Sequence, residues 1–122
     1  RCGWIDAEVV RFSCRLNGAT EIALTRLDVL DGFGGLKIAT GYTLNGEKVT
    51  YADCDTEQLQ ECQPVLEEVE GWSESTGSAR EYDELPRAAQ QYVARLAELA
   101  GVPITLIGVG PQREQLVVRP PA

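Results

Sequence analysis

The segment Thr25-Arg26-Leu27-Asp28 places a hydroxyl, a guanidinium and a carboxylate within four residues. It lies in an apolar stretch, residues 22–30, which the composition predicts to be a buried strand of a parallel sheet. In open α/β sheets, ligands bind beyond the carboxyl ends of the strands. A carboxylate there can accept hydrogen bonds from both N1–H and the exocyclic amine of guanine, whereas adenine has no such donor pair. The segment therefore indicates a guanine-binding site in which the Asp28 carboxylate would recognise the base.

The energetics of such a contact are large enough to give specificity. Charge-assisted hydrogen bonds contribute about 1.5–3 kcal/mol each, so a well-placed Asp28 could discriminate by several orders of magnitude. The flat guanidinium of Arg26 could lie over the same base. The alternative is that Asp28 caps a turn or a helix start, since a short basic-x-acidic pattern is common by chance.

A second candidate is the glycine-rich run Gly108-Val109-Gly110-Pro111, which ends a predicted strand over residues 104–109. Glycine lets backbone approach a flat ligand closely, and free backbone groups there could contact a base edge. The alternative is an ordinary tight turn. Because both candidates lie at carboxyl ends of strands, we expect them to share one edge of a sheet.

Groups for chemistry on phosphates are missing from the sequence. It contains no Gly-x-x-x-x-Gly-Lys-Ser/Thr loop, and residues 31–35 are glycine-rich but carry no lysine, so we interpret them as a loop. Histidine is absent, which excludes a Ser-His or Cys-His nucleophile within this chain. We therefore assign no catalytic residue and no metal ligand. The acid pairs Glu67/Glu68 and Asp83/Glu84 are interpreted as solvated surface.

The four cysteines, at positions 2, 14, 54 and 62, include no Cys-x-x-Cys pair. A zinc site would need all four to converge from distant places, and the chain is neither small nor Cys-dense in the manner of a disulfide scaffold. We expect buried free thiols.

Composition and charge narrow the class of protein. The 122 residues suffice for one domain, and a formal charge of −8 disfavours nucleic acid and anionic membranes as partners. No apolar run is long enough for a membrane span, and no signal peptide opens the chain, so we expect a cytoplasmic protein. Because the sequence does not begin with Met, we predict a fragment or a processed product.

The predicted elements alternate between helix and strand. A helix over 6–17 has Asp6 as its cap and Gly18 as its stop, with an apolar stripe of Val9, Val10, Phe12, Ser13 and Leu16. Asn45-Gly46 predicts a hairpin between strands 36–44 and 47–51. A short helix over 55–62, a strand over 65–69, a helix from Pro86 to the stop at Gly101, and strands over 104–109 and 116–119 complete the chain. The class is α/β, with flanking helices, a mostly parallel sheet and an antiparallel hairpin.

Five blocks of the sequence occur in this order: residues 1–6, 24–32, 71–76, 101–104 and 109–113. The block 24–32 and the block Gly-Trp-Ser-Glu-Ser-Thr at 71–76 are the specific ones. Together the blocks resemble the C-terminal part of one family, adenylosuccinate synthetase, and the resemblance covers essentially the whole chain.

The resemblance implies an activity and a set of contacts. The family uses GTP and Mg²⁺ to join L-aspartate to IMP, giving adenylosuccinate, GDP and phosphate, as a carbon-nitrogen ligase of purine biosynthesis. Its enzymes are typically homodimers. Its guanine-binding motifs map onto Thr25, Arg26 and Asp28 and onto Gly108, Val109, Gly110 and Pro111. Arg1 resembles the last arginine of a loop that holds IMP and aspartate.

Departures from the family pattern also matter. Arg26 replaces the usual lysine, and Gly108 and Val109 supply no hydroxyl where relatives often have one. The family's phosphate loop, catalytic Asp and catalytic His belong to an N-terminal part that this chain lacks, together with the Mg²⁺ ligands. We therefore expect residues 1–122 to be a single C-terminal domain, inactive in isolation. The alternatives are a non-catalytic acidic α/β regulatory or interaction module, or a piece of another GTP-dependent enzyme.

Overall fold

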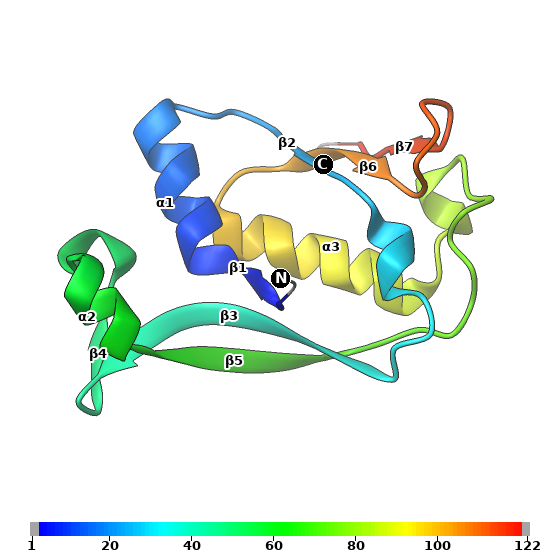
Figure 1. Ribbon diagram of the computed structural model, residues 1–122. Helices are drawn as coiled ribbons and strands as arrows, with labels where there is room; N and C mark the ends of the chain where they lie inside the picture. The colour runs from blue at the N-terminus through cyan, green and yellow to red at the C-terminus, as the bar shows by residue number, and fades with distance from the viewer. Residues whose placement is uncertain (1–2, 121–122) are drawn as a thin grey trace.

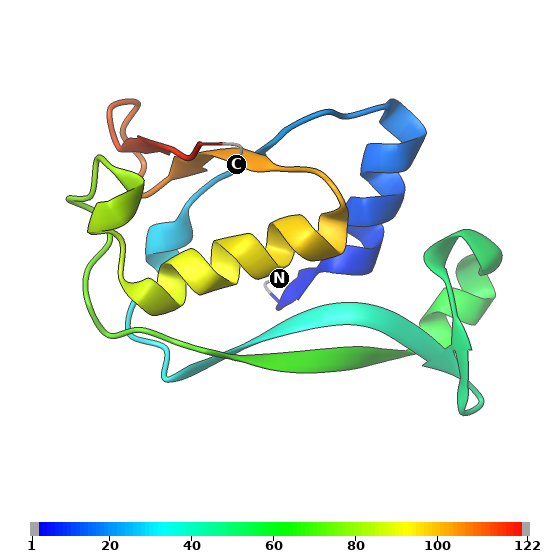
Figure 2. The same cartoon turned by 180° about the vertical axis from the view of Figure 1, so that it is seen from behind.

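A computed structural model describes residues 3–120, which form two small sheets with a long helix between them. Figure 1 shows α3 (Arg87–Ala100) crossing the centre, the β3–β5 sheet on one side and the β2–β6–β7 sheet on the other, and Figure 2 shows the same layering from behind. The α/β class is confirmed. No helix within residues 3–120 has the length and apolarity needed to cross a membrane.

The first sheet is built around the long strand β3 (Gly35–Leu44). β1 (Ile5–Asp6) pairs with it in parallel, while β4 (Glu47–Val49) and β5 (Gln63–Glu70) pair antiparallel. Asn45 and Gly46 both have positive φ, 55° and 84°, which is the two-residue turn that the Asn-Gly pair predicts. Between β4 and β5 lies the short helix α2 (Thr56–Glu61), whose Asp55–Gln58 capping box confirms the predicted start.

The second sheet contains β2 (Ile22–Leu24), β6 (Ile104–Gly108) and β7 (Leu116–Val118). β2 pairs in parallel with β6, and β7 pairs antiparallel with the other edge of β6. β2 therefore has the predicted parallel neighbour, but only on one side among the described residues.

Helix α3 supplies much of the core. It begins after Pro86 and ends at Gly101 (φ 74°), as predicted. Its predicted apolar face is confirmed, because each of its members is at most 6% exposed: Leu85, Ala89, Tyr92, Val93, Leu96 and Ala100. On another side, Arg95 donates to both carboxylate oxygens of Glu67 in β5, at 2.7 Å each, and so ties the helix to the first sheet.

Helix α1 (Ala7–Asn17) has the predicted ends but not the predicted face. The Asp6 side chain accepts hydrogen bonds from the amides of Glu8 and Val9, and Gly18 ends the helix at φ 65°. The buried positions are Ala7 and Cys14, two turns apart, because this line of the helix faces the core. Leu16, assigned to the apolar stripe, is 72% exposed, so that part of the prediction is wrong.

The predicted strand over 22–30 is also wrong beyond Leu24. Arg26 adopts a left-handed conformation (φ 57°) and a 3-10 turn follows over Leu27–Leu30. The reason is the spacing of the leucines. A 3-10 turn places residues three apart on one side, so Leu27 and Leu30 face the core while Val29 is 56% exposed. The return strand of the hairpin likewise ends early, at Val49, before a 3-10 turn over Tyr51–Asp53.

Gly71, at the end of β5, sits where no side chain fits. A methyl group there would lie 1.9 Å from the carbonyl oxygen of Phe33 and 2.9 Å from the carbonyl carbon of Gly34. We expect Gly71→Ala to destabilise the fold by about 1–3 kcal/mol, because backbone rather than a flexible side chain must move. Thermal unfolding measures this. Gly35→Ala is the matched control, since a methyl at Gly35 meets open space, and an equal effect of both would contradict the prediction.

Candidate functional site

The two candidate segments leave the same edge of the second sheet. Leu24 of β2 lies opposite Ile107 of β6, so the chain exits both strands side by side. A methyl group on Gly108 would lie 3.4 Å from both the Cα of Thr25 and the amide nitrogen of Arg26. The expected shared edge is therefore confirmed, although Asp28 stands in a 3-10 turn rather than at the tip of a strand.

The carboxylate of Asp28 lies at the surface and is held by its neighbour. Arg26 donates from Nε to one oxygen at 3.1 Å and from Nη2 to the other at 3.3 Å, with the Arg26 and Asp28 side chains 48% and 21% exposed. The guanidinium is therefore engaged with the carboxylate. A carboxylate accepts about four hydrogen bonds, so Asp28 keeps capacity for two more donors.

Strain marks the same place. A left-handed φ at a residue other than glycine costs about 1–3 kcal/mol and concentrates at functional sites. At Arg26 this conformation bends the chain after Thr25, and the guanidinium of Arg26 then lies against the carboxylate of Asp28. The bend therefore sets the position of the pair.

The Gly108–Pro111 segment offers backbone rather than side chains. Val109 is fully buried, backbone included, and its amide donates to the carbonyl of Gln115 at 2.9 Å, so the reachable backbone of the segment is that of its neighbours. Gly110 is half-buried and Pro111 is exposed. A methyl group on Gly110 would overlap the amide group of the Gln115 side chain, at 2.3 Å.

Asp31 is a structural centre that the sequence did not reveal. Its carboxylate accepts hydrogen bonds from the indole N–H of Trp72 (2.7 Å) and from the amide and hydroxyl of Thr76 (both 2.9 Å). Thr76 is fully buried and Trp72 nearly so. These bonds fasten the 71–77 loop to the turn that carries Asp28.

Gln115 makes a second connection to the same loop. Its side-chain amide donates to the carbonyl of Gly77 at 3.2 Å, while its side-chain oxygen accepts from the amide of Gln112 at 3.1 Å. The 71–77 loop is thus fixed to both candidate segments, which explains how a loop distant in sequence can support their positions.

Comparison with known proteins places this geometry in a family. The profile of the family described as Adenylosuccinate synthetase matches residues 1–117. The chain belongs to the adenylosuccinate synthetase family. An adenylosuccinate synthetase of Pelobacter propionicus is 50% identical over 118 residues, and one of Geotalea daltonii is 48% identical over 118 residues. Each alignment covers 97% of this chain and 27% of the relative, so the chain spans about a quarter of their length.

A solved structure agrees with the family assignment. The structure described as fully ligated adenylosuccinate synthetase from Plasmodium falciparum matches with a TM-score of 0.93 and 32% identity. The match covers 98% of this chain and 29% of that one. Family membership argues against an unrelated acidic interaction module, which was the alternative left open by the sequence.

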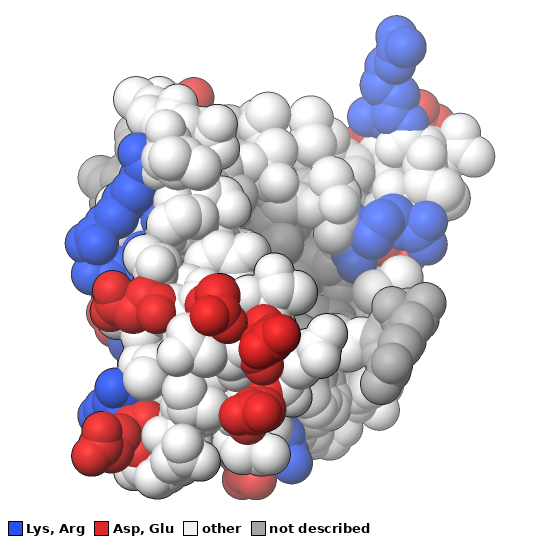
Figure 3. All heavy atoms as spheres, turned by 60° about the vertical axis from the view of Figure 1, so that its left-hand side comes forward, with Lys and Arg blue, Asp and Glu red and all other residues white. Residues whose placement is uncertain are grey.

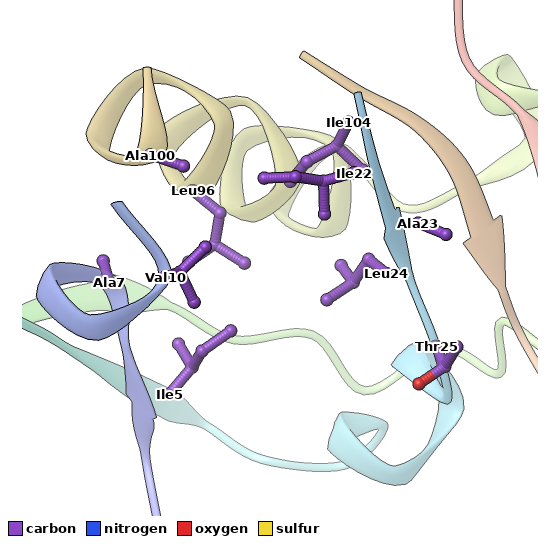
Figure 4. A pocket seen from close by; sticks show the side chains of 10 residues that line it. All are labelled: Ile5, Ala7, Val10, Ile22, Ala23, Leu24, Thr25, Leu96, Ala100 and Ile104. Atoms are coloured by element: carbon purple, nitrogen blue, oxygen red, sulfur yellow. The ribbon is translucent and has the colours of Figure 1, made fainter. Parts of the chain in front are cut away.

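Two hollows in this member of the adenylosuccinate synthetase family border the candidate site. One, of about 310 Å³, adjoins Thr25 and Arg26 and includes Tyr92, whose pKa burial raises to about 12, so that its hydroxyl stays protonated. The other, of about 350 Å³, lies between α1, α3 and β2. Figure 4 shows Ile5, Val10, Leu24 and Leu96 pointing toward one another across it, whereas the side chain of Ala23 points away. Thr25 is the one polar residue of a lining that also includes Ala7, Ile22, Ala100 and Ile104.

Neither a metal centre nor the substrate loop can be built from the described residues. Across residues 3–120, no three His, Cys, Asp or Glu side chains gather as metal ligands, so these residues do not fit the family's Mg²⁺. Arg1, assigned to the IMP and aspartate loop, lies outside the described residues.

Proposed function

We propose that this chain is the guanine-recognising, C-terminal portion of an adenylosuccinate synthetase. The parent would be a cytoplasmic, homodimeric ligase that joins L-aspartate to IMP with GTP and Mg²⁺ in purine biosynthesis. The observation that carries the proposal is the meeting of the Thr25–Asp28 and Gly108–Pro111 segments at one sheet edge, with the Asp28 carboxylate at the surface.

Each segment has a distinct role in this proposal. Asp28 accepts hydrogen bonds from N1–H and the exocyclic amine of guanine, using the lone pairs that Arg26 leaves free. Arg26 orients the carboxylate and takes the place of the family's lysine. Gly108, Gly110 and Pro111 bring backbone against the base, and the buried Val109 between them holds this segment to the fold. Thr25 borders the hollow beside the base. Arg1 contacts the IMP and aspartate side of the parent site.

We further propose that the chain is not catalytic by itself. It has no histidine, and it carries no phosphate loop. The second hollow has apolar walls without a charged side chain, so it cannot hold phosphates. Affinity for GTP would therefore come from the base alone.

The apolar hollow fits a different occupant, the part of the family's length outside these residues. β1 and β2 each pair with one strand among the described residues, and Ile5 of β1 and Leu24 of β2 line the same hollow. Two strand edges bordering an apolar hollow favour added strands, which would satisfy the backbone groups and cover the side chains. Such strands could come from the roughly three-quarters of the relatives' length that this chain does not span.

A chimera tests the proposal. The matching quarter of the Pelobacter propionicus relative is replaced by this chain, and adenylosuccinate formation is measured with GTP, IMP and L-aspartate. We expect ligase activity from the chimera and none from the chain alone, together with weak or undetectable GTP binding by the chain in calorimetry. A folded chimera that does not use GTP would contradict the assignment, and nanomolar GTP binding by the chain alone would contradict its dependence on the rest of the enzyme.

A further inference from the structure

Cys54 and Cys62 lie next to each other at the two ends of α2. Their sulfur atoms are 3.9 Å apart, and both residues are half-buried. Cys54 directly precedes the capping residue Asp55, and Cys62 follows the last residue of the helix. Cys14, in contrast, is buried in α1. The chain thus holds one close pair of accessible thiols, among the residues described, and neither proposed nucleotide contact involves it.

Local structure fixes this proximity. The capping box of Asp55 and Gln58 defines where the helix starts, and the amide of Cys62 donates to the carbonyl of Gln58 at 3.0 Å. Both cysteines have extended backbones just outside the helix, and because α2 has only 6 residues, their side chains can approach each other along it. We propose that Cys54 and Cys62 are a modification site, a dithiol that forms a reversible disulfide tying together the two ends of α2.

The required movement is small. The sulfurs must close by about 2 Å to reach disulfide bonding distance. α2 buries none of its residues and lies at the end of the β4–β5 connection, so rotation about χ1 and a small shift of its ends meet no packed core. The closed loop spans residues 54–62.

The reaction is a thiol–disulfide exchange with a small-molecule disulfide as oxidant. The thiolate of one cysteine attacks a sulfur of the reagent, whose S–S bond breaks and releases one small thiol. The second cysteine loses its proton and attacks the sulfur of the first cysteine, which releases the reagent's remaining half as a second small thiol. The protein dithiol is thereby oxidised to a disulfide and the reagent is reduced to two thiols.

The electrostatic surroundings determine which oxidant reacts. Partial burial, the hydrogen bond with Cys62 and the charges of Asp53 and Asp55 raise the pKa of the Cys54 thiol. Glu57 and Glu61 of α2 are exposed nearby, and Figure 3 shows acidic side chains gathered on this side of the molecule. An anionic disulfide would be repelled by these charges. A neutral one is therefore the suitable reagent.

The site is separate from the proposed guanine site. Figure 1 shows α2 at the opposite end of the molecule from the 3-10 turn of residues 27–30. Oxidation of the pair should therefore leave the surroundings of Asp28 unchanged, and failure of either proposal would not affect the other.

Mass spectrometry of the purified, reduced chain tests the pairing. The chain is treated with neutral bis(2-hydroxyethyl) disulfide, free thiols are alkylated, and trypsin then releases residues 49–80 as one peptide containing both cysteines. We expect this peptide to lose two hydrogens and to resist alkylation. Cleavage after Glu57 or Glu61 should leave its halves joined, and dithiothreitol should separate them.

Variants make the result specific. In Cys54→Ser or Cys62→Ser, the remaining cysteine should carry one reagent group as a stable mixed disulfide, since no neighbouring thiol can displace it. Cys14→Ser is the matched control and should form the 54–62 disulfide as the wild type does. Persistent double alkylation of the 49–80 peptide, or pairing of Cys54 with Cys2 or Cys14, would overturn the proposal.

Discussion

Replacement of Asp31 by alanine should lower the free energy of unfolding by about 3–5 kcal/mol. The carboxylate accepts from the Trp72 indole and from two groups of Thr76, and neither partner can turn to water because both are buried. Leaving buried donors without an acceptor costs more than the hydrogen bonds themselves contribute. The loss would also loosen the attachment of the 71–77 loop to the turn carrying Asp28, and would leave the backbone hydrogen bond from Gly32 to Trp72 in place.

Urea denaturation of the purified chain measures this effect. Asp28→Ala is the matched control, three residues away, because it removes an exposed ion pair and should cost less than about 1 kcal/mol. Asp31→Asn keeps one acceptor oxygen and should fall between the two. If Asp31→Ala and Asp28→Ala unfold at the same urea concentration, the hydrogen bonds of Asp31 do not hold the loop.

The sequence predictions are accurate where interactions between residues close in the sequence decide an element, and less so where distant residues decide it. The ends of α1, α2 and α3 depend on caps and glycines within a few residues, and those predictions are confirmed. The apolar face of α3 is confirmed because its periodicity is strong and all of its residues pack into the core. Leu16 of α1 was misassigned because the side of the helix that is covered depends on where α1 packs.

Long-range contacts explain what was missed. The bend at Arg26 arises because Leu27 and Leu30 must both reach the core, which an extended strand cannot do for residues three apart. Asp31 and Thr76 are 45 residues apart, so nothing local in the glycine-rich loop indicated their hydrogen bonds. The sequence did hold one signal: in the Gly-Trp-Ser-Glu-Ser-Thr block, the indole of Trp72 and the hydroxyl of Thr76 are hydrogen-bond donors that need an acceptor if they are buried.

The adjacency of the two candidate segments was predictable for a physical reason. Two parallel strands send the chain out at the same edge, so segments following β2 and β6 must approach each other. The pairing of Arg26 with Asp28 was not expected, because the sequence suggested a guanidinium free to cover a base. The pairing therefore favours an orienting role for Arg26 over a stacking role.

The most selective functional prediction concerns Asp28→Asn in the chimeric ligase. We expect kcat/KM for GTP to fall about 100- to 1,000-fold, because asparagine offers one acceptor where the base presents two donors, and its own amide opposes the second. Xanthosine triphosphate replaces the exocyclic amine with a carbonyl, which the new amide can contact. The variant should therefore gain activity with xanthosine triphosphate while it loses activity with GTP.

Steady-state kinetics with both nucleotides check this exchange of preference. Asp83→Asn, the same change at an exposed carboxylate outside the proposed site, is the matched control and should leave the kinetics with both nucleotides unchanged. The KM values for IMP and L-aspartate should also stay constant, since Asp28 contacts neither in the proposed site. A loss of fold would lower the activity with both nucleotides, so it cannot account for a variant whose activity rises with xanthosine triphosphate and falls with GTP. Unchanged GTP kinetics in a folded Asp28→Asn chimera would remove Asp28 from base recognition.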